Sequence, residues 1–301
     1  QIDKAEVTDF ASFVRAKTQF NWHQDFNSLW QWSVDHMPEF WDLLWDWHGI
    51  IGDKGDRILA NPNTMLGAEF FPDAQINFAE NLLADADERL AISAHSEDGR
   101  IARLTRAELK QRVLALAGWL QSHGVTEGDR VAAYTPNCVE TVIAMLATAS
   151  LGAVFSSCSP DFGLQGVCDR FGQIEPKILI GCDGYHYAGK NIDRMDVLTA
   201  LVDKLPTVDT VLVIGYLSTY PDCNRLPNAM LFDQALASAT PVNEFRRMPF
   251  NAPLYILYSS GTTGAPKCIV HGIGGTLLQH IKEHRLHTNL TAGDTFFYFT
   301  T

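Results

Sequence analysis

The fold of this chain is decided by the stretch Gly128 to Cys182, which reads GDRVAAYTPNCVETVIAMLATASLGAVFSSCSPDFGLQGVCDRFGQIEPKILIGC. Short apolar runs alternate in this stretch with segments that have helical periodicity. The runs RVAAY, AVFSSC and KILIGC are typical of buried strands, and the segments between them are typical of helices. This βαβαβ order with short loops predicts an α/β fold: a doubly wound, mostly parallel sheet flanked by helices.

The same pattern extends on both sides of this stretch. Upstream, Thr105 with Glu108 three residues later predicts a capping box, and Gly124 closes the helix that follows. Downstream, VDTVLVIG and LYILYSS have the composition of further strands. A ligand crevice is expected at the carboxyl ends of the strands. The GxGxxG fingerprint is missing from the strand-to-helix turns, so a Rossmann cofactor site is not expected.

Residues 1–80 have a different composition from the rest of the chain. Six of the seven tryptophans lie from Trp22 to Trp47, and PEFWDLLWDWHG predicts an amphipathic helix that begins near Pro38 and ends at Gly49. We therefore expect a helical N-terminal extension over residues 1–80 and a larger domain over residues 81–301. An aromatic cage for a ligand is the less favoured alternative to an aromatic core.

Charge and composition exclude several classes of function. The chain has 35 acidic and 23 basic residues and no basic run, so a nucleic-acid partner is not expected. The uncharged stretch 141–160 is about long enough to span a membrane, but Gly152, Pro160 and its acidic flanks favour a helix followed by a strand. There is no basic region followed by an apolar core at the N-terminus. We therefore expect a cytoplasmic protein, without membrane association, whose six cysteines are reduced and buried.

Residues 258–267, YSSGTTGAPK, form the strongest candidate site. Gly261 and Gly264 let consecutive N–H groups turn toward one point, and Lys267 adds a positive charge. Four hydroxyl groups add further donors: those of Ser259, Ser260, Thr262 and Thr263. Such a loop fits a polyphosphate, although it differs from GxxxxGK[ST] and is followed by the strand KCIVHG where a P-loop requires a helix. A polar hairpin turn is the alternative.

Four segments carry a resemblance to a known family. YSSGTTGAPK resembles the phosphate-binding signature of the adenylate-forming acyl-CoA synthetases, and FFPDAQINFAENLL, residues 70–83, resembles the N-terminal segment of their acetyl-CoA synthetase subgroup. Residues 156–190 and 269–301 look most like the acetoacetyl-CoA synthetases within that family. The resemblance runs from about Trp22 to Thr301. It implies that the chain is an N-terminal portion, without the family's C-terminal domain.

The resemblance also implies a reaction and its substrates. A carboxylate, here acetoacetate, attacks the α-phosphate of ATP bound with Mg2+, and CoA then displaces AMP. The phosphate contacts implied are those of Ser259, Ser260, Gly261, Thr262, Thr263, Gly264 and Lys267. The CoA contacts implied are those of Asp161, Phe162 and Gly163, and of Gly189 and Lys190 in the segment YAGK. No catalytic residue is expected in the chain itself, because the adenylation lysine belongs to the C-terminal domain; we expect the chain to be inactive alone. An acetyl- or propionyl-CoA synthetase, a non-catalytic nucleotide-binding module and a kinase of unusual loop type remain alternatives.

Two further groups of residues are possible sites by their composition. His280, His284 and His287 fall at i, i+4 and i+7 of one predicted helix, where a solvated histidine stripe is favoured over a zinc site, so no metal centre is expected. Cys268 follows Lys267 in the apolar strand CIV. We expect it to be an inert core thiol, because burial raises the pKa of a thiol.

Overall fold

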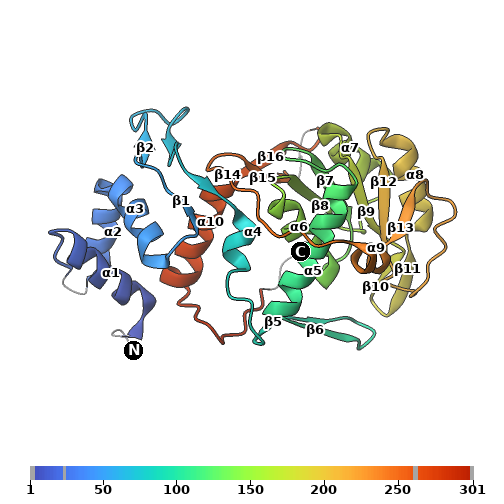
Figure 1. Cartoon of the computed structure of the whole chain (residues 1–301), viewed down its shortest axis with the longest axis horizontal. Helices are drawn as coiled ribbons and strands as arrows, with labels where there is room; N and C mark the ends of the chain where they lie inside the picture. Colours follow the sequence, from blue (N-terminus) through green and yellow to red (C-terminus); the bar gives the residue numbers. More distant parts are fainter. Residues whose placement is uncertain (1–3, 23–24, 260–263, 299–301) are drawn as a thin grey trace. The chain divides into compact units, whose positions relative to one another are not determined.

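The computed structural model describes residues 4–22, 25–259 and 264–298 (Figure 1). The chain divides into two compact units. The first unit comprises Gln1–Ile76, Met248–Asn251 and Ile273–Thr301, and the second comprises Asn77–Arg247 and Ala252–Gly272.

The second unit is built on a sheet that has seven strands among the described residues, in the order β13-β12-β9-β7-β8-β15-β16. Neighbouring strands pair in parallel except β15 and the edge strand β16, which are antiparallel. The predicted doubly wound, mostly parallel sheet is confirmed. The strands of this sheet are β7 Arg130–Tyr134, β8 Val154–Cys158, β9 Ile178–Cys182, β12 Thr210–Ile214, β13 Ala229–Leu231, β15 Pro253–Tyr258 and β16 Cys268–Gly272.

The strand order of this sheet reverses at β7. The strand that follows β7 in the chain, β8, lies on one side of it, and the next, β9, lies on the other. A doubly wound sheet opens a crevice at the carboxyl ends of its strands where such a reversal occurs. The ends of β7, β8 and β9 are therefore the place to look for a ligand site.

Helices cover both faces of the sheet (Figure 1). On one face α6 (Val139–Ser150) packs with α5 (Arg106–Ser122), which in turn contacts α9 (Phe232–Ser238). On the other face lie α7 (Leu164–Ile174) and α8 (Met195–Lys204). The capping box of α5 is confirmed: the Glu108 N–H donates to Thr105 Oγ1 at 3.2 Å, and the Thr105 N–H donates to Glu108 Oε2 at 2.8 Å.

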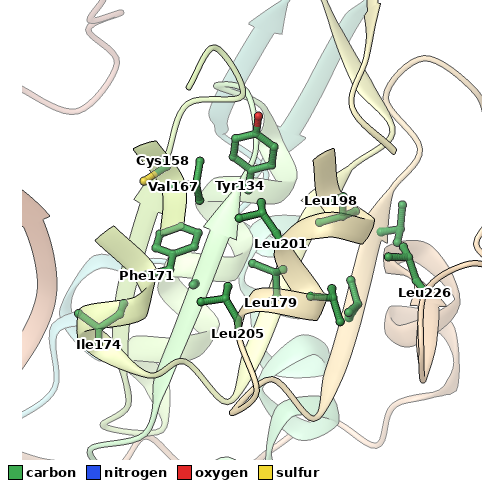
Figure 2. Close-up of a cluster of buried hydrophobic side chains, with 14 of the residues drawn as sticks. Tyr134, Cys158, Val167, Phe171, Ile174, Leu179, Leu198, Leu201, Leu205 and Leu226 are labelled. Atoms are coloured by element: carbon green, nitrogen blue, oxygen red, sulfur yellow. The ribbon is translucent and has the colours of Figure 1, made fainter. Parts of the chain in front are cut away.

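The core under α7 and α8 is apolar and closely packed. Figure 2 shows Phe171 of α7 and Leu201 of α8 with Leu179 of β9, and these three side chains are fully buried. Alternate residues of each strand face this side because side chains point in turn to opposite faces of a sheet. Tyr134, the last residue of β7, is fully buried in the same cluster and places its hydroxyl at the carboxyl end of the sheet.

Three smaller elements complete the second unit. Helix α4 (Phe78–Leu82) begins at Asn77, whose buried side chain accepts the Glu80 N–H. Two antiparallel hairpins lie outside the main sheet. They are β5 (Leu90–His95) with β6 (Ile101–Thr105), and β10 (Gly184–Tyr187) with β11 (Lys190–Asp193).

The first unit is assembled from segments that are far apart in the chain. Its β4 (Gln75–Ile76) pairs in antiparallel fashion with both β1 (Gly52–Asp53) and β14 (Met248–Pro249). A second short pair is β2 (Leu59–Ala60) with β3 (Glu69–Phe70). The helices of this unit are α1 (Glu6–Lys17), α2 (Phe26–Asp35), α3 (Met37–His48), α10 (Ile273–Ile281) and the π-helix η2 (Lys282–His287).

Helix α3 is the helix predicted from PEFWDLLWDWHG. Pro38 lies in its first turn, and Gly49 caps it with a left-handed φ of 76°. Its buried Trp45 lies with its ring centroid 5.1 Å from that of Phe71, which lies 4.9 Å from the ring of Phe250. The aromatic face of this helix is therefore a core.

Within the described residues, no helix is long and apolar enough to cross a membrane. The uncharged stretch 141–160 forms most of α6 and all of β8, as expected from its glycine and proline.

Candidate functional site

The candidate site lies at the carboxyl ends of β8 and β15. These strands run parallel, with Tyr255 opposite Phe155 and Ile256 opposite Ser156, so the loops that follow them emerge at the same edge of the sheet. We call residues 259–267 the phosphate loop and residues 159–163 the SPDFG loop. Of the residues expected to bind phosphate, Ser260, Gly261, Thr262 and Thr263 lie outside the described residues, and Ser259, Gly264 and Lys267 are described.

Two hydrogen bonds close the base of the phosphate loop. The Ser259 N–H donates to the Lys267 carbonyl at 3.0 Å, and the Lys267 N–H donates to Ser259 Oγ at 3.1 Å. Lys267 is exposed, and no described carboxylate lies within ion-pair distance of its ammonium. The loop therefore starts and ends at one point, with a cation there that is not neutralised by a described residue.

Tyr258, the last residue of β15, underlies the start of this loop. Its hydroxyl lies 3.0 Å from Ser156 Oγ, which also lies 2.8 Å from the Ile256 carbonyl oxygen. Burial raises the pKa of Tyr258 far above its usual range, so the phenol stays neutral. This neutral, half-buried side chain fixes the end of the strand from which the loop departs.

The SPDFG loop is held by side chains that no sequence motif indicates. The Tyr134 hydroxyl lies 2.7 Å from the Phe162 carbonyl oxygen and 2.9 Å from that of Pro160, and burial raises the pKa of Tyr134 to about 12. Arg194 Nε donates to the Pro160 carbonyl at 2.8 Å. The position of Tyr134 at the end of a buried strand was the one available signal in the sequence.

Tyr185 connects the SPDFG loop to the hairpin that carries the second group of expected CoA contacts. Its hydroxyl donates to Asp161 Oδ1 at 2.6 Å, and it lies on β10. The tip of that hairpin, Ala188 and Gly189, has positive φ angles of 50° and 73°. The Gly189 N–H donates to Glu97 Oε2 at 3.2 Å, so a carboxylate already occupies this amide. Lys190, the first residue of β11, is exposed.

The histidines do not lie on one continuous α-helix. His280 is in α10, whereas His284 and His287 are in the π-helix η2, whose wider i to i+5 turns break the i, i+4, i+7 register. The rings of His280 and His284 are 6.0 Å apart between centroids. In the described part of the chain, no group of three or more His, Cys, Asp or Glu side chains is placed to hold a metal ion.

The expectation that Cys268 is a buried core thiol is wrong. Cys268 is exposed, because β16 is the edge strand of the sheet and its neighbours Ile269 and Val270 are exposed as well. Of the six cysteines expected to be buried, Cys138, Cys158 and Cys182 are, and burial raises the pKa of each to about 12. Cys168 and Cys223 are only half-buried.

Comparisons with known proteins bear on this site. The family model of the AMP-binding enzymes matches residues 80–301. An acetoacetyl-coenzyme A synthetase of Rhizobium meliloti (strain 1021) is 47% identical over 279 residues, and an acetoacetyl-CoA synthetase of Xenopus tropicalis is 43% identical over 288. Each alignment covers 92% of this chain and 43% of the relative, so the chain spans less than half the length of these relatives.

Solved structures give the same picture. The acetoacetyl-CoA synthetase from Streptomyces lividans superimposes with a TM-score of 0.92 at 38% sequence identity, over 99% of this chain and 46% of that one. This agreement extends over both compact units and includes the sheet that carries the candidate site. By the match of the family model over most of its length, the chain belongs to the AMP-binding enzyme family.

Proposed function

We propose that the chain is the ATP-phosphate-binding part of an acid–thiol ligase that converts acetoacetate to acetoacetyl-CoA. The acetoacetate carboxylate attacks the α-phosphate of Mg-ATP, a new P–O bond forms, and pyrophosphate leaves with the electron pair of the broken bond. The thiol of CoA then displaces AMP from acetoacetyl-AMP. Charge develops on phosphate oxygens in the first step, so stabilisation by N–H groups, hydroxyls and a lysine is the help this step needs.

The observation that carries the proposal is the base of the phosphate loop. The reciprocal hydrogen bonds between Ser259 and Lys267 bring both ends of a loop rich in glycine and hydroxyl groups to one point, beside an exposed lysine. In this proposal the β- and γ-phosphates are held by Ser260, Gly261, Thr262, Thr263 and Gly264. Ser259 supports the loop, and Lys267 neutralises charge.

For CoA we propose two contacts on the second unit. The SPDFG loop, through Asp161, Phe162 and Gly163, faces the pantetheine arm, and Gly189 with Lys190 contacts the nucleotide. The hydrogen bond of Tyr185 to Asp161 supports this pairing, because it ties the SPDFG loop to the hairpin that carries Lys190. The Glu97 carboxylate accepts the Gly189 N–H and repels an anionic ligand there. Lys190 is therefore the main contributor to the contact with the CoA nucleotide.

The proposal extends to the organisation and location of the enzyme. Residues 1–80 are the N-terminal extension, residues 81–301 are the first part of the adenylation domain, and the catalytic lysine is supplied by a C-terminal domain outside this chain. All six cysteines are free in the structure, which supports a cytoplasmic location.

The test is a substrate panel with the enzyme at the full length of its relatives. Pyrophosphate release and hydroxamate formation from Mg-ATP are measured with acetoacetate, acetate, propionate and malonamate, the last an amide of similar size and shape. We expect acetoacetate to give the highest kcat/KM. A preference for acetate or propionate would assign the chain to an acetyl- or propionyl-CoA synthetase. Binding of ATP without pyrophosphate release from any acid would instead favour a non-catalytic nucleotide-binding module.

A further inference from the structure

We propose that helix α7 positions both ends of the phosphate loop, with Gln173 acting at the end of the loop and Arg170 at its start. The inference rests on the proposed function, because it assigns positioning residues to the same site. Neither residue is part of the loop or of its sequence signature.

Gln173 contacts the chain on both sides of Lys267. Its Nε2 donates to the Pro266 carbonyl at 2.9 Å, and its Oε1 lies 3.7 Å from the Cys268 thiol, which donates to it. Pro266 is buried although the residues on either side of it are exposed. One side chain of α7 therefore contacts the backbone before the lysine that is proposed to neutralise phosphate charge, and the side chain of the residue after it.

Arg170 lies one turn earlier on the same face of α7, since residues three apart are neighbours on a helix. Its guanidinium lies 5.8 Å from the ring centroid of Tyr258, the residue that precedes the phosphate loop, and 4.3 Å from that of Phe162 in the SPDFG loop. Its Nη1 donates to the Gly166 carbonyl at 2.7 Å, which holds the side chain in place. Arg170 thus contacts the SPDFG loop and the residue that precedes the phosphate loop, whereas Gln173 contacts the end of the phosphate loop and the residue that follows it.

These contacts matter because ordering a glycine-containing backbone around a ligand costs conformational entropy. Contacts from a rigid helix at both ends reduce the number of these conformations before ATP binds, and pre-organisation of this kind increases affinity. Loss of Gln173 is therefore expected to weaken ATP binding. Loss of Arg170 is expected to weaken ATP binding and also to slow the step that uses CoA.

The first experiment is Gln173→Ala in the full-length enzyme. Loss of the hydrogen bond to the Pro266 carbonyl predicts a rise of about 3- to 10-fold in the KM for Mg-ATP in the adenylation half-reaction. Thioester formation from supplied acetoacetyl-AMP is expected to stay within about twofold of wild type. The matched control is Gln165→Ala on the same helix: Gln165 Nε2 donates to Asp169 Oδ1 at 2.6 Å, away from the loop, and its removal should change neither half-reaction.

The second experiment is Arg170→Met, which keeps the apolar stem and removes the cation, with Arg170→Lys as the conservative variant. We expect both half-reactions to fall by about 3- to 10-fold in Arg170→Met, with partial recovery in Arg170→Lys. Melting temperatures are measured for every variant. A Gln173→Ala enzyme with a wild-type KM for Mg-ATP would overturn the inference. So would a Gln173→Ala enzyme that loses equal activity in both half-reactions and has a lowered melting temperature. If the wild-type enzyme forms no adenylate with any acid of the panel, the proposed function fails instead.

Discussion

The two compact units are built in different ways. In the second unit the parallel strands β7, β8 and β9 follow one another in the chain, are joined by single helices, and lie together in the sheet in the order β9-β7-β8. In the first unit Arg285 Nε donates to Glu6 Oε2 at 2.8 Å across 279 positions of sequence, and β4 pairs with β14. The contrast shows that one protein can contain a unit encoded by local pattern and a unit encoded by distant contacts.

The largest expected effect comes from emptying each core in turn. Phe71→Ala in the first unit and Phe171→Ala in the second each remove a fully buried ring, which should lower the free energy of unfolding by about 3 to 5 kcal/mol. Six of the seven tryptophans belong to the first unit, so urea unfolding followed by tryptophan fluorescence reports mainly on that unit. Hydrogen exchange of the amides in the seven-stranded sheet reports on the second unit.

We expect Phe71→Ala to change the fluorescence transition most and Phe171→Ala to change exchange in the strands most. If both variants shift both signals equally, the two units unfold together. The units then differ in how far apart in sequence their contacts lie, but not in stability.

The next effect tests where the activity resides. Thr262→Ala or Thr263→Ala removes one hydroxyl donor to a charged oxygen, a loss of about 1.5 to 3 kcal/mol and hence about 10- to 150-fold in adenylation. Both positions lie outside the described residues, and the prediction follows from the sequence of the loop. Thioester formation from supplied acetoacetyl-AMP should be nearly unchanged. Equal losses in the two half-reactions would favour a plain hairpin turn.

A pair of neighbouring glycines gives a smaller effect within the first unit. A Cβ on Gly274 of α10 would lie 2.1 Å from the Phe250 ring, whereas no atom lies within 4 Å of a Cβ on Gly275. We expect Gly274→Ala to cost about 1 to 3 kcal/mol by overpacking, and Gly275→Ala to stabilise the helix by up to about 1 kcal/mol. Thermal melting of both variants checks this. A neutral Gly274→Ala would show that Phe250 moves aside at little cost.

The smallest expected effect is a difference in acid sensitivity. Burial, and then the nearby Arg285, lower the pKa of His48 in the first unit, with Glu6 acting in the opposite sense. The unfolded chain therefore binds a proton near pH 6.5 that the folded chain does not, so stability is complete above that pH and is lost as the pH falls through the lowered pKa. His48→Gln should remove this dependence between pH 7.5 and 5.5. A melting temperature with the same pH dependence in both proteins would contradict it.

The same contrast explains what could be predicted from sequence. The parallel sheet, the capping box at Thr105 and the helix ending at Gly49 depend on residues close together in the chain, and each is confirmed. That Phe250 packs on Phe71 depends on a contact across the chain that no local pattern encodes. The exposure of Cys268 depends on the position of β16 at the sheet edge, which its apolar sequence does not indicate.

For the candidate site, the density of glycines and hydroxyls predicts the loop, and its role in binding phosphate stays a prediction. Its supporting residues were not. Tyr134, Gln173 and Arg194 act through positions on separate strands, helices and loops, and only the folded structure brings them to the two loops.

The discontinuous first unit also has a consequence for synthesis. The helices of residues 6–48 leave the ribosome early, but Arg285, which binds Glu6, is made only after a further 279 residues have been added. At about 5 to 20 residues per second, this takes roughly 14 to 56 s. For most of this interval Trp45 and Phe71 lack Phe250, whose ring packs on both, so these two rings are a target for a chaperone that binds nascent chains.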